Sequence, residues 1–166
     1  MWEKHANALL AIILACILWG ALAIQFLNHE VPCALCFLQR LGMIGVAAGA
    51  LMNVKFAPRA MHYGFSLLAA IFGGSVAIRQ ISLHACPQFP TFGLPFWGLS
   101  LYTWSFLVFV ASVLYIGLIL MVFDHSDYHI KDSKPNWWGQ LAFWMVSLVA
   151  LTNIFASLWV CGLNAC

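Results

Sequence analysis

The chain has 166 residues, of which 64% are hydrophobic and only 7% are charged, and its formal net charge is +2 at pH 7. This composition excludes a soluble globular domain, in which about a quarter of the residues are charged. The chain is therefore an integral membrane protein, and we expect a phospholipid bilayer around it and no nucleic-acid partner.

Five apolar runs are long enough to cross a membrane, whose hydrocarbon core needs roughly 20 apolar residues per helix. The first run is too long for a cleavable signal peptide, so we expect it to remain as a helix. The predicted fold is an all-α membrane protein, a transmembrane four-helix bundle with a fifth transmembrane helix, in one domain over residues 1–166. The predicted spans cover residues 8–27, 37–54, 61–83, 99–123 and 138–160.

A pair of cysteines, Cys33 and Cys36, lies between the first two spans. A CxxC pair places one sulfur near the first turn of a helix, where the helix dipole favours the reactive thiolate. Arg40 follows Cys36 by four positions and so shares its helix face. Its guanidinium can favour a thiolate on Cys36 and donate hydrogen bonds to a carbonyl oxygen of a ligand. Alternatively, Arg40 reaches toward phospholipid headgroups.

The loops differ in character. Residues 87–98, after Cys86, combine prolines with aromatic side chains suited to the headgroup boundary, so we expect this loop to lie along the membrane surface. It serves either as an anchor or for access of a partner or lipid substrate. Residues 124–136 form a polar connector, and the fifth span is followed by a tail that ends in Cys166.

Most basic residues and most cysteines fall on opposite sides of the five predicted spans, although Arg40 and Arg79 fall at or near the cysteine side. Cytoplasmic loops retain Lys and Arg, and here they hold Lys4, Lys55, Arg59, Lys131 and Lys134. The other side receives Cys33, Cys36, Cys86, Cys161 and Cys166. Disulfides persist in the periplasm or another oxidising space, whereas cytosolic thiols are kept reduced. We therefore predict a multi-pass protein with a cytoplasmic N-terminus, whose outer cysteines and C-terminus face the periplasm or another oxidising space.

A dithiol on the outer side needs an electron acceptor. The sequence has no glycine-rich nucleotide-binding loop and no haem or iron–sulfur spacing. A membrane quinone, ubiquinone or menaquinone, fits because it accepts the two electrons and two protons that a dithiol releases. Attack of Cys36 on the quinone ring, followed by attack of Cys33, would reoxidise the pair.

Two segments carry a family resemblance. Residues 32–40, PCALCFLQR, resemble the catalytic segment of the DsbB (disulfide-bond formation protein B) family, and residues 97–104, WGLSLYTW, resemble the entry to its fourth helix. The similarity covers roughly residues 9–123 and leaves 124–166 as an addition. It implies a quinone-dependent thiol oxidase that reoxidises a DsbA-like periplasmic thioredoxin-fold protein and so supports disulfide bond formation. Cys33 and Cys36 become the quinone-linked pair, and Arg40 becomes a quinone contact.

The resemblance also implies a quinone contact near the outer end of the third span, where Arg79 and Gln80 lie. Gln80 aligns with a position at which a histidine is common, and its amide can still donate a hydrogen bond. His84, one turn further on, would substitute for it or would face the headgroups.

The family usually has a second cysteine pair before its fourth helix, whereas this chain has only Cys86 there. Cys161 and Cys166 are candidates for the missing pair, which would pass electrons from the DsbA-like protein to Cys33–Cys36. Alternatively, they form a static disulfide that pins the tail, and Cys86 relays electrons transiently or replaces one of them.

Other functions stay open. A quinone-linked disulfide reductase would move electrons in the opposite direction. A non-enzymatic assembly subunit would use the glycine stripe of the second span as its oligomer contact, although the stripe also suits close packing within the bundle; it consists of Gly42, Gly45 and Gly49. We expect no metal, but a zinc or copper site is conceivable with Cys33, Cys36, Cys86 and His29 or His84.

Overall fold

The computed structural model describes residues 2–28, 33–56, 58–84, 97–122 and 137–161. Within these ranges the chain forms five α-helices, each long and apolar enough to cross a membrane. This confirms the predicted fold class. The helices are α1 (Trp2–Leu27), α2 (Ala34–Lys55), α3 (Ala60–His84), α4 (Leu101–Val122) and α5 (Trp137–Cys161).

The helix ends agree with the predicted spans except at α1, which begins at Trp2 rather than at residue 8. Hydropathy detects only the apolar part of a helix, and the polar first turns escape it. Asn7 is nevertheless buried, and its side chain donates to the backbone oxygen of Glu3 and to the Tyr63 hydroxyl. Contacts with α3 therefore support this early part of α1.

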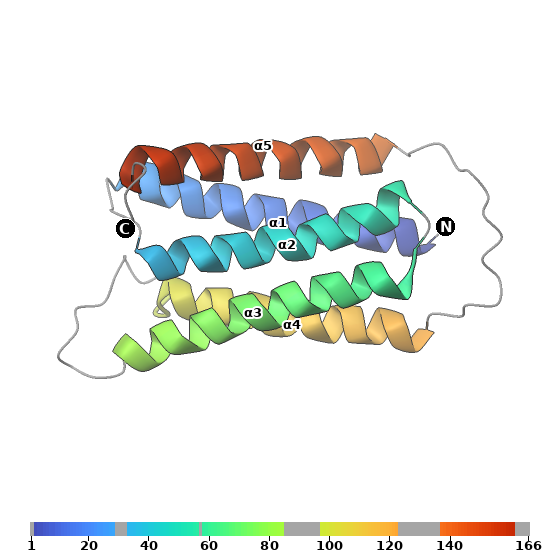
Figure 1. The fold of residues 1–166 in the computed structure, drawn as a ribbon, viewed down its shortest axis with the longest axis horizontal. Coiled ribbons are helices and arrows are strands. Elements are labelled where there is room, and N and C mark those ends of the chain that lie inside the picture. Colours follow the sequence, from blue (N-terminus) through green and yellow to red (C-terminus); the bar gives the residue numbers. More distant parts are fainter. Residues whose placement is uncertain (1, 29–32, 57, 85–96, 123–136, 162–166) are drawn as a thin grey trace.

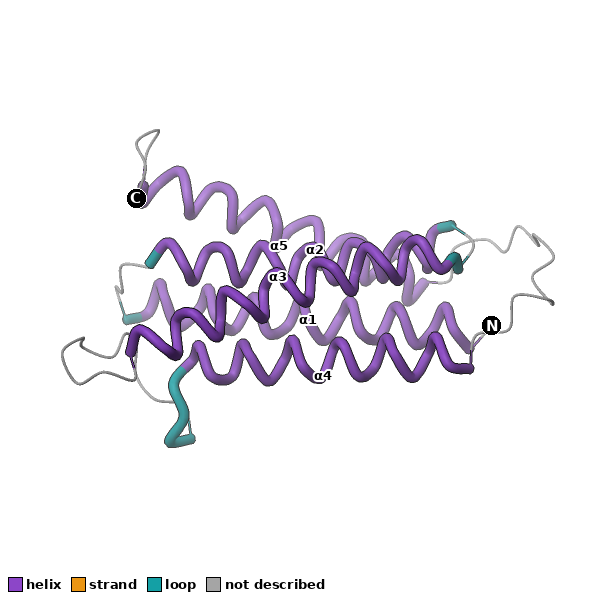
Figure 2. The backbone as a smooth tube through the Cα atoms, turned by 60° about the horizontal axis from the view of Figure 1, so that its bottom comes forward, coloured by secondary structure: helices purple, strands orange, loops and turns teal. Residues whose placement is uncertain are grey.

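The helices run along a common axis, and α2 is at the centre of their contacts (Figure 1). It packs against α1, α3 and α5, and α3 packs against α4. A hydrogen bond from the Tyr115 hydroxyl to the backbone oxygen of Ala6 links α4 to α1. The fifth helix lies outside the four-helix group, against α1 and α2, as the turned view also shows (Figure 2).

The glycine stripe of α2 lies against α3. A Cβ atom at Gly42 would lie 2.9 Å from the backbone of Gly73, and one at Gly49 would lie 2.9 Å from the backbone oxygen of His62. The missing side chains therefore let two helix backbones approach closely. This is the packing role that the sequence left open.

The two ends of the bundle differ in charge and chemistry. Lys4, Lys55 and Arg59 lie at one end, where α1 and α3 begin and α2 ends. Cys33 lies at the other end, where α2 begins and α3 and α5 finish (Figure 1). The chain directions therefore separate Lys4, Lys55 and Arg59 from the dithiol along the length of the bundle, whereas Arg40 and Arg79 lie toward the dithiol end.

Candidate dithiol site

The dithiol is built on the first turn of α2. Cys33 precedes the helix in an extended conformation, with φ −77° and ψ 155°, and acts as its N-cap. Its Sγ accepts the backbone N–H of Cys36 at 3.3 Å, in the way a serine or aspartate oxygen does at this position. The Cys33 sulfur therefore lies at the positive end of the helix dipole.

The two sulfurs lie within bonding reach of each other. Both thiols are free and half-buried, and the two Sγ atoms are 2.8 Å apart. A disulfide needs a separation of about 2.05 Å, so small side-chain rotations are enough to close it.

Cys33 is the more acidic member of the pair. The hydrogen bond from the Cys36 thiol is the largest influence that lowers the pKa of the Cys33 thiol, to about 6. Backbone N–H groups and the Gln80 side chain act in the same direction, whereas burial opposes them. At neutral pH Cys33 is therefore a thiolate, the form that attacks in thiol–disulfide exchange.

Gln80 of α3 points its amide at the dithiol. Its Nε2 lies 3.4 Å from the Cys33 Sγ and 3.5 Å from the Cys36 Sγ. Its Oε1 accepts a 2.6 Å hydrogen bond from Nε2 of Gln39 on α2. Both glutamine side chains are buried, with 3% of Gln39 and 1% of Gln80 exposed.

Arg40 lies one turn below Cys36, close enough to both sulfurs for its charge to attract theirs. Its hydrogen bonds go to α1 instead: Nη1 donates to Gln25 Oε1 at 2.5 Å, and Nη2 donates to the Ala21 oxygen at 3.3 Å. The phospholipid alternative is thus not needed to satisfy these two N–H groups.

The other candidates on α3, Arg79 and His84, lie near the same end of the helix as Gln80. The His84 ring stacks on Tyr102 at a centroid distance of 5.1 Å, and its Nδ1 lies 2.8 Å from the Gln80 backbone oxygen. Arg79 is exposed. Of the three α3 candidates, Gln80 is the one the fold brings to the cysteines.

Two further residues of this site were missed in the sequence analysis. Gln39 and Gln25 are buried amides in apolar helices. A buried polar group costs free energy unless it is hydrogen-bonded, so a glutamine inside a membrane span is a signal that could have found both.

The remaining cysteines are only partly placed. Cys86 and Cys166 lie outside the described residues, as does His29. The backbone of Cys161 ends α5 at the same end of the bundle as Cys33 (Figure 1). No group of three potential metal ligands occurs among the side chains in the described ranges.

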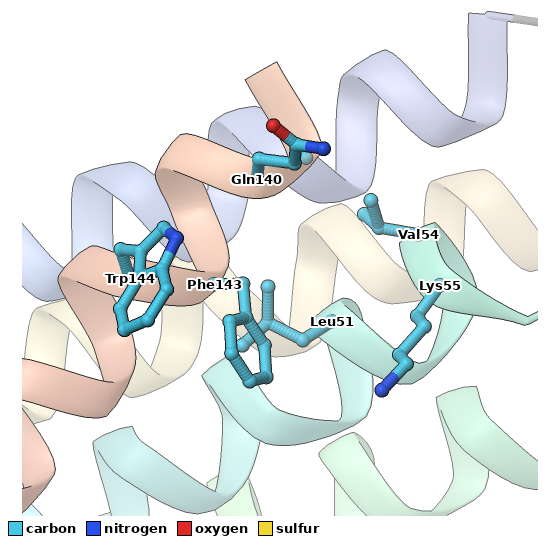
Figure 3. A pocket seen from close by; sticks show the side chains of 7 residues that line it. Leu51, Val54, Lys55, Gln140, Phe143 and Trp144 are labelled. Carbon is cyan, nitrogen blue, oxygen red and sulfur yellow. The ribbon is translucent and has the colours of Figure 1, made fainter. Parts of the chain in front are cut away.

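A hollow of about 320 Å³ lies between α2 and α5 (Figure 3). Its wall includes Lys55, Phe143 and Trp144. Lys55 ends α2, whereas Cys33 precedes its start, so this hollow is at the opposite end of the bundle from the dithiol. It is not where an acceptor could reach the sulfurs.

Comparison with known proteins supplies the family. The model of the disulfide bond formation protein DsbB family matches residues 3–92, more than half of the chain. The chain belongs to the DsbB family. The match contains α1, α2 and α3, and with them Cys33, Cys36, Gln39 and Gln80.

Individual relatives share only part of their sequence with the chain. The chain is 38% identical over 71 residues to disulfide bond formation protein B of Chromobacterium violaceum, covering 40% of this chain and 43% of the relative. It is 30% identical over 90 residues to the protein of that name from Burkholderia pseudomallei, covering 52% and 53%. It is also 33% identical over 98 residues to NADH-ubiquinone oxidoreductase chain 6 of Danio rerio, covering 55% of each chain.

The chain thus spans about half the length of the curated relatives it matches. No solved structure matches it significantly. The DsbB match makes a role in disulfide bond formation the coarse functional assignment.

Proposed function

We propose that this protein oxidises the dithiol of a DsbA-like periplasmic thioredoxin-fold protein and passes the electrons to a membrane quinone. The observation that carries the proposal is the Cys33–Cys36 pair, with sulfurs 2.8 Å apart at a helix N-terminus, in a chain of the DsbB family.

The chain's own chemistry is a dithiol–disulfide cycle. Closing the Cys33–Cys36 bond is a two-electron oxidation: the dithiol gives up two electrons and two protons, and the acceptor takes up both. Reduced partner thiols then reopen the disulfide by exchange and become oxidised themselves. Net turnover moves two electrons and two protons from the partner to the acceptor.

Ubiquinone or menaquinone is the proposed acceptor, and it supplies a membrane-soluble sink for two electrons and two protons. A quinone carbonyl needs N–H donors beside the sulfurs. Arg40 carries five N–H donors, and its two hydrogen bonds to α1 hold the guanidinium near the dithiol. Gln80 provides an amide on the other side. These residues fit a carbonyl ligand, and Arg79 and His84 lie around them on α3.

The dithiol end is proposed to face the periplasm of a bacterial inner membrane. The basic end with Lys4, Lys55 and Arg59 then faces the cytoplasm, as the positive-inside rule requires.

The tail cysteines are proposed to meet the partner first. The support for this is that the α5 backbone ends, at Cys161, at the same end of the bundle as the dithiol. Electrons would pass from the partner to Cys161–Cys166 and then to Cys33–Cys36, with Cys86 as a transient relay. A static tail disulfide predicts unchanged turnover in Cys161→Ser, whereas a shuttle predicts its loss.

The test is quinone reduction by the purified full chain after addition of a reduced thioredoxin-fold dithiol protein. We expect rapid reduction that Cys36→Ser abolishes. Cys16→Ser is the matched control, since Cys16 lies on the exposed side of α1 away from the dithiol, and it should leave the rate unchanged. Equal rates in the wild type and Cys36→Ser would contradict the proposal. Net flow from quinol to the partner disulfide would indicate the reductase instead.

A further inference from the structure

Two buried glutamines stand out because the dithiol–disulfide cycle does not require them. Gln39 is on α2 and Gln80 is on α3, and together they join the two helices directly beneath the sulfurs. In an apolar bundle, a buried amide is retained at a cost unless its polar atoms are paired. The hydrogen bonds of Gln39 and Gln80 therefore indicate the role of the two side chains at the dithiol.

The first step is the orientation of Gln80. Its Oε1 is occupied by Nε2 of Gln39 at 2.6 Å. Because one side of the amide is fixed as an acceptor, the Nε2 side of Gln80 has to face the cysteines. There it lies 3.4 Å from the Cys33 Sγ.

The second step is the chemical consequence. An N–H group favours a thiolate over a thiol, because only the thiolate is a strong acceptor. The Cys33 Sγ already accepts the backbone N–H of Cys36 at 3.3 Å, so Gln80 adds a second N–H donor from a different helix. A stabilised thiolate favours the reduced pair and makes its disulfide easier to reduce.

We propose that Gln80 is a catalytic residue that stabilises the Cys33 thiolate, and that Gln39 is a positioning residue that acts through Gln80 by holding its amide in the donating orientation. The proposal rests on the proposed function only in taking Cys33–Cys36 as the working pair.

Other groups near Cys33 have to be separated from this effect. Among the described residues these are Cys36 and Arg40 on α2 and His84 on α3. His84 contacts the backbone oxygen of Gln80 through its ring Nδ1 at 2.8 Å. The experiment is therefore repeated with His84→Asn, which should retain the difference between the wild type and the Gln80 variant.

The experiment measures the alkylation rate of Cys33 against pH in the full chain, with mass spectrometry of the Cys33–Cys36 segment. Gln80→Met keeps the side-chain volume but removes the N–H donor. We expect the pH of half-maximal alkylation to rise by about one unit, a tenfold loss of thiolate at fixed low pH. Gln80→Glu replaces the N–H donor with an acceptor and should raise the pH of half-maximal alkylation further. This variant tests the inference if Gln80→Met does not fold. Gln140→Met, an exposed glutamine on α5, is the matched control and should not shift the profile.

A double-mutant cycle tests the positioning role. Gln39→Met should shift the profile in the same direction, and Gln39→Met combined with Gln80→Met should shift it no more than Gln80→Met does. Additive shifts would show that Gln39 acts independently and would overturn the positioning role. No shift in either Gln80 variant would overturn the whole inference.

A second readout is the fraction of Cys33–Cys36 disulfide in glutathione buffers. Gln80→Met should increase the oxidised fraction at a fixed buffer ratio, because the reduced form loses a stabilising bond. Neither readout needs a quinone or a protein partner. A wild-type chain that reduces no quinone, together with shifted profiles in the variants, would reject the proposed function and keep this inference.

Discussion

At the scale of single residues, the dithiol is asymmetric. Cys33 is the N-cap of α2, and its sulfur accepts hydrogen bonds. Cys36 lies inside the helix, and its backbone N–H donates to the Cys33 sulfur. The sulfur outside the first turn is therefore the one favoured as the thiolate, and the sulfur inside the turn donates a hydrogen bond to it. The sequence predicts a thiolate near the helix start, with Arg40 able to favour it on Cys36. The N-cap geometry favours it on Cys33, and spacing does not reveal which sulfur caps the helix.

The acidity of Cys33 gives a direct pH prediction. Since its pKa is lowered to about 6, the thiolate should be present above that pH and lost below it. The alkylation rate of Cys33 should therefore be half-maximal near pH 6 and almost constant above about pH 7. Cys36→Ala removes the largest cause of the shift and should move the midpoint toward about 8.5, the value of an ordinary thiol. A wild-type midpoint near that of an ordinary thiol would contradict the assignment.

Arg40 gives a stability prediction at the same scale. Its guanidinium donates to Gln25, whose side chain is buried in α1. Gln25→Met removes this acceptor within an apolar bundle, and we expect a loss of about 1 kcal/mol in the free energy of unfolding. Unfolding of the detergent-solubilised protein by sodium dodecyl sulfate would measure it. Gln140→Met serves as the control, and equal stability of both variants would show that the Arg40 bond contributes little.

At the scale of elements, length and backbone contact determine how α2 and α3 hold the site. Each helix is long enough to span a bilayer, and the glycines at positions 42 and 73 bring the two backbones together. Gln39 precedes Gly42 on α2 by three positions and faces Gln80 on α3. The close approach of the helices is thus a condition for the hydrogen bond between the glutamines.

Glycine substitutions test this dependence. In Gly42→Ala the new Cβ would lie 2.9 Å from the Gly73 backbone, so one helix has to move. We expect a loss of about 1–3 kcal/mol in the free energy of unfolding, as for overpacked cores, together with a higher midpoint for Cys33 alkylation. Gly117→Ala on α4 meets nothing within 4 Å and should be neutral. Equal melting of the two variants in detergent would refute this account of the interface.

At the scale of the whole molecule, the alternating helix directions sort the chemistry by end. The dithiol, its glutamines and the end of α5 share one end, and Lys4, Lys55 and Arg59 share the other (Figure 1). The fifth helix packs against α1 and α2, whereas α3 packs against α2 and α4. The α5 backbone therefore ends at the dithiol end of the bundle without contributing to the interface between α2 and α3.

Labelling from one side of the membrane tests this arrangement. In spheroplasts, a membrane-impermeant maleimide should label Cys33 directly. A cysteine introduced by Lys55→Cys, at the other end of α2, should react only after permeabilisation, because one membrane span separates the two positions. Cys16→Ser in both proteins removes the thiol on α1. Labelling of both positions from the same side would contradict the topology.

The sequence by itself determined the membrane class, the five helices and the place of the Cys33–Cys36 dithiol at the start of the second one. These depend on local properties: apolar length, helix periodicity and the spacing of Cys33 and Cys36 are all written along the chain. The tertiary structure decided the rest. The contact of Gln80 with the two sulfurs depends on how α1, α2 and α3 are rotated against one another. The same rotation decides that Gln39 orients the Gln80 amide and that α1 holds Arg40. That rotation follows from side-chain packing between residues up to 47 positions apart, which no local pattern records.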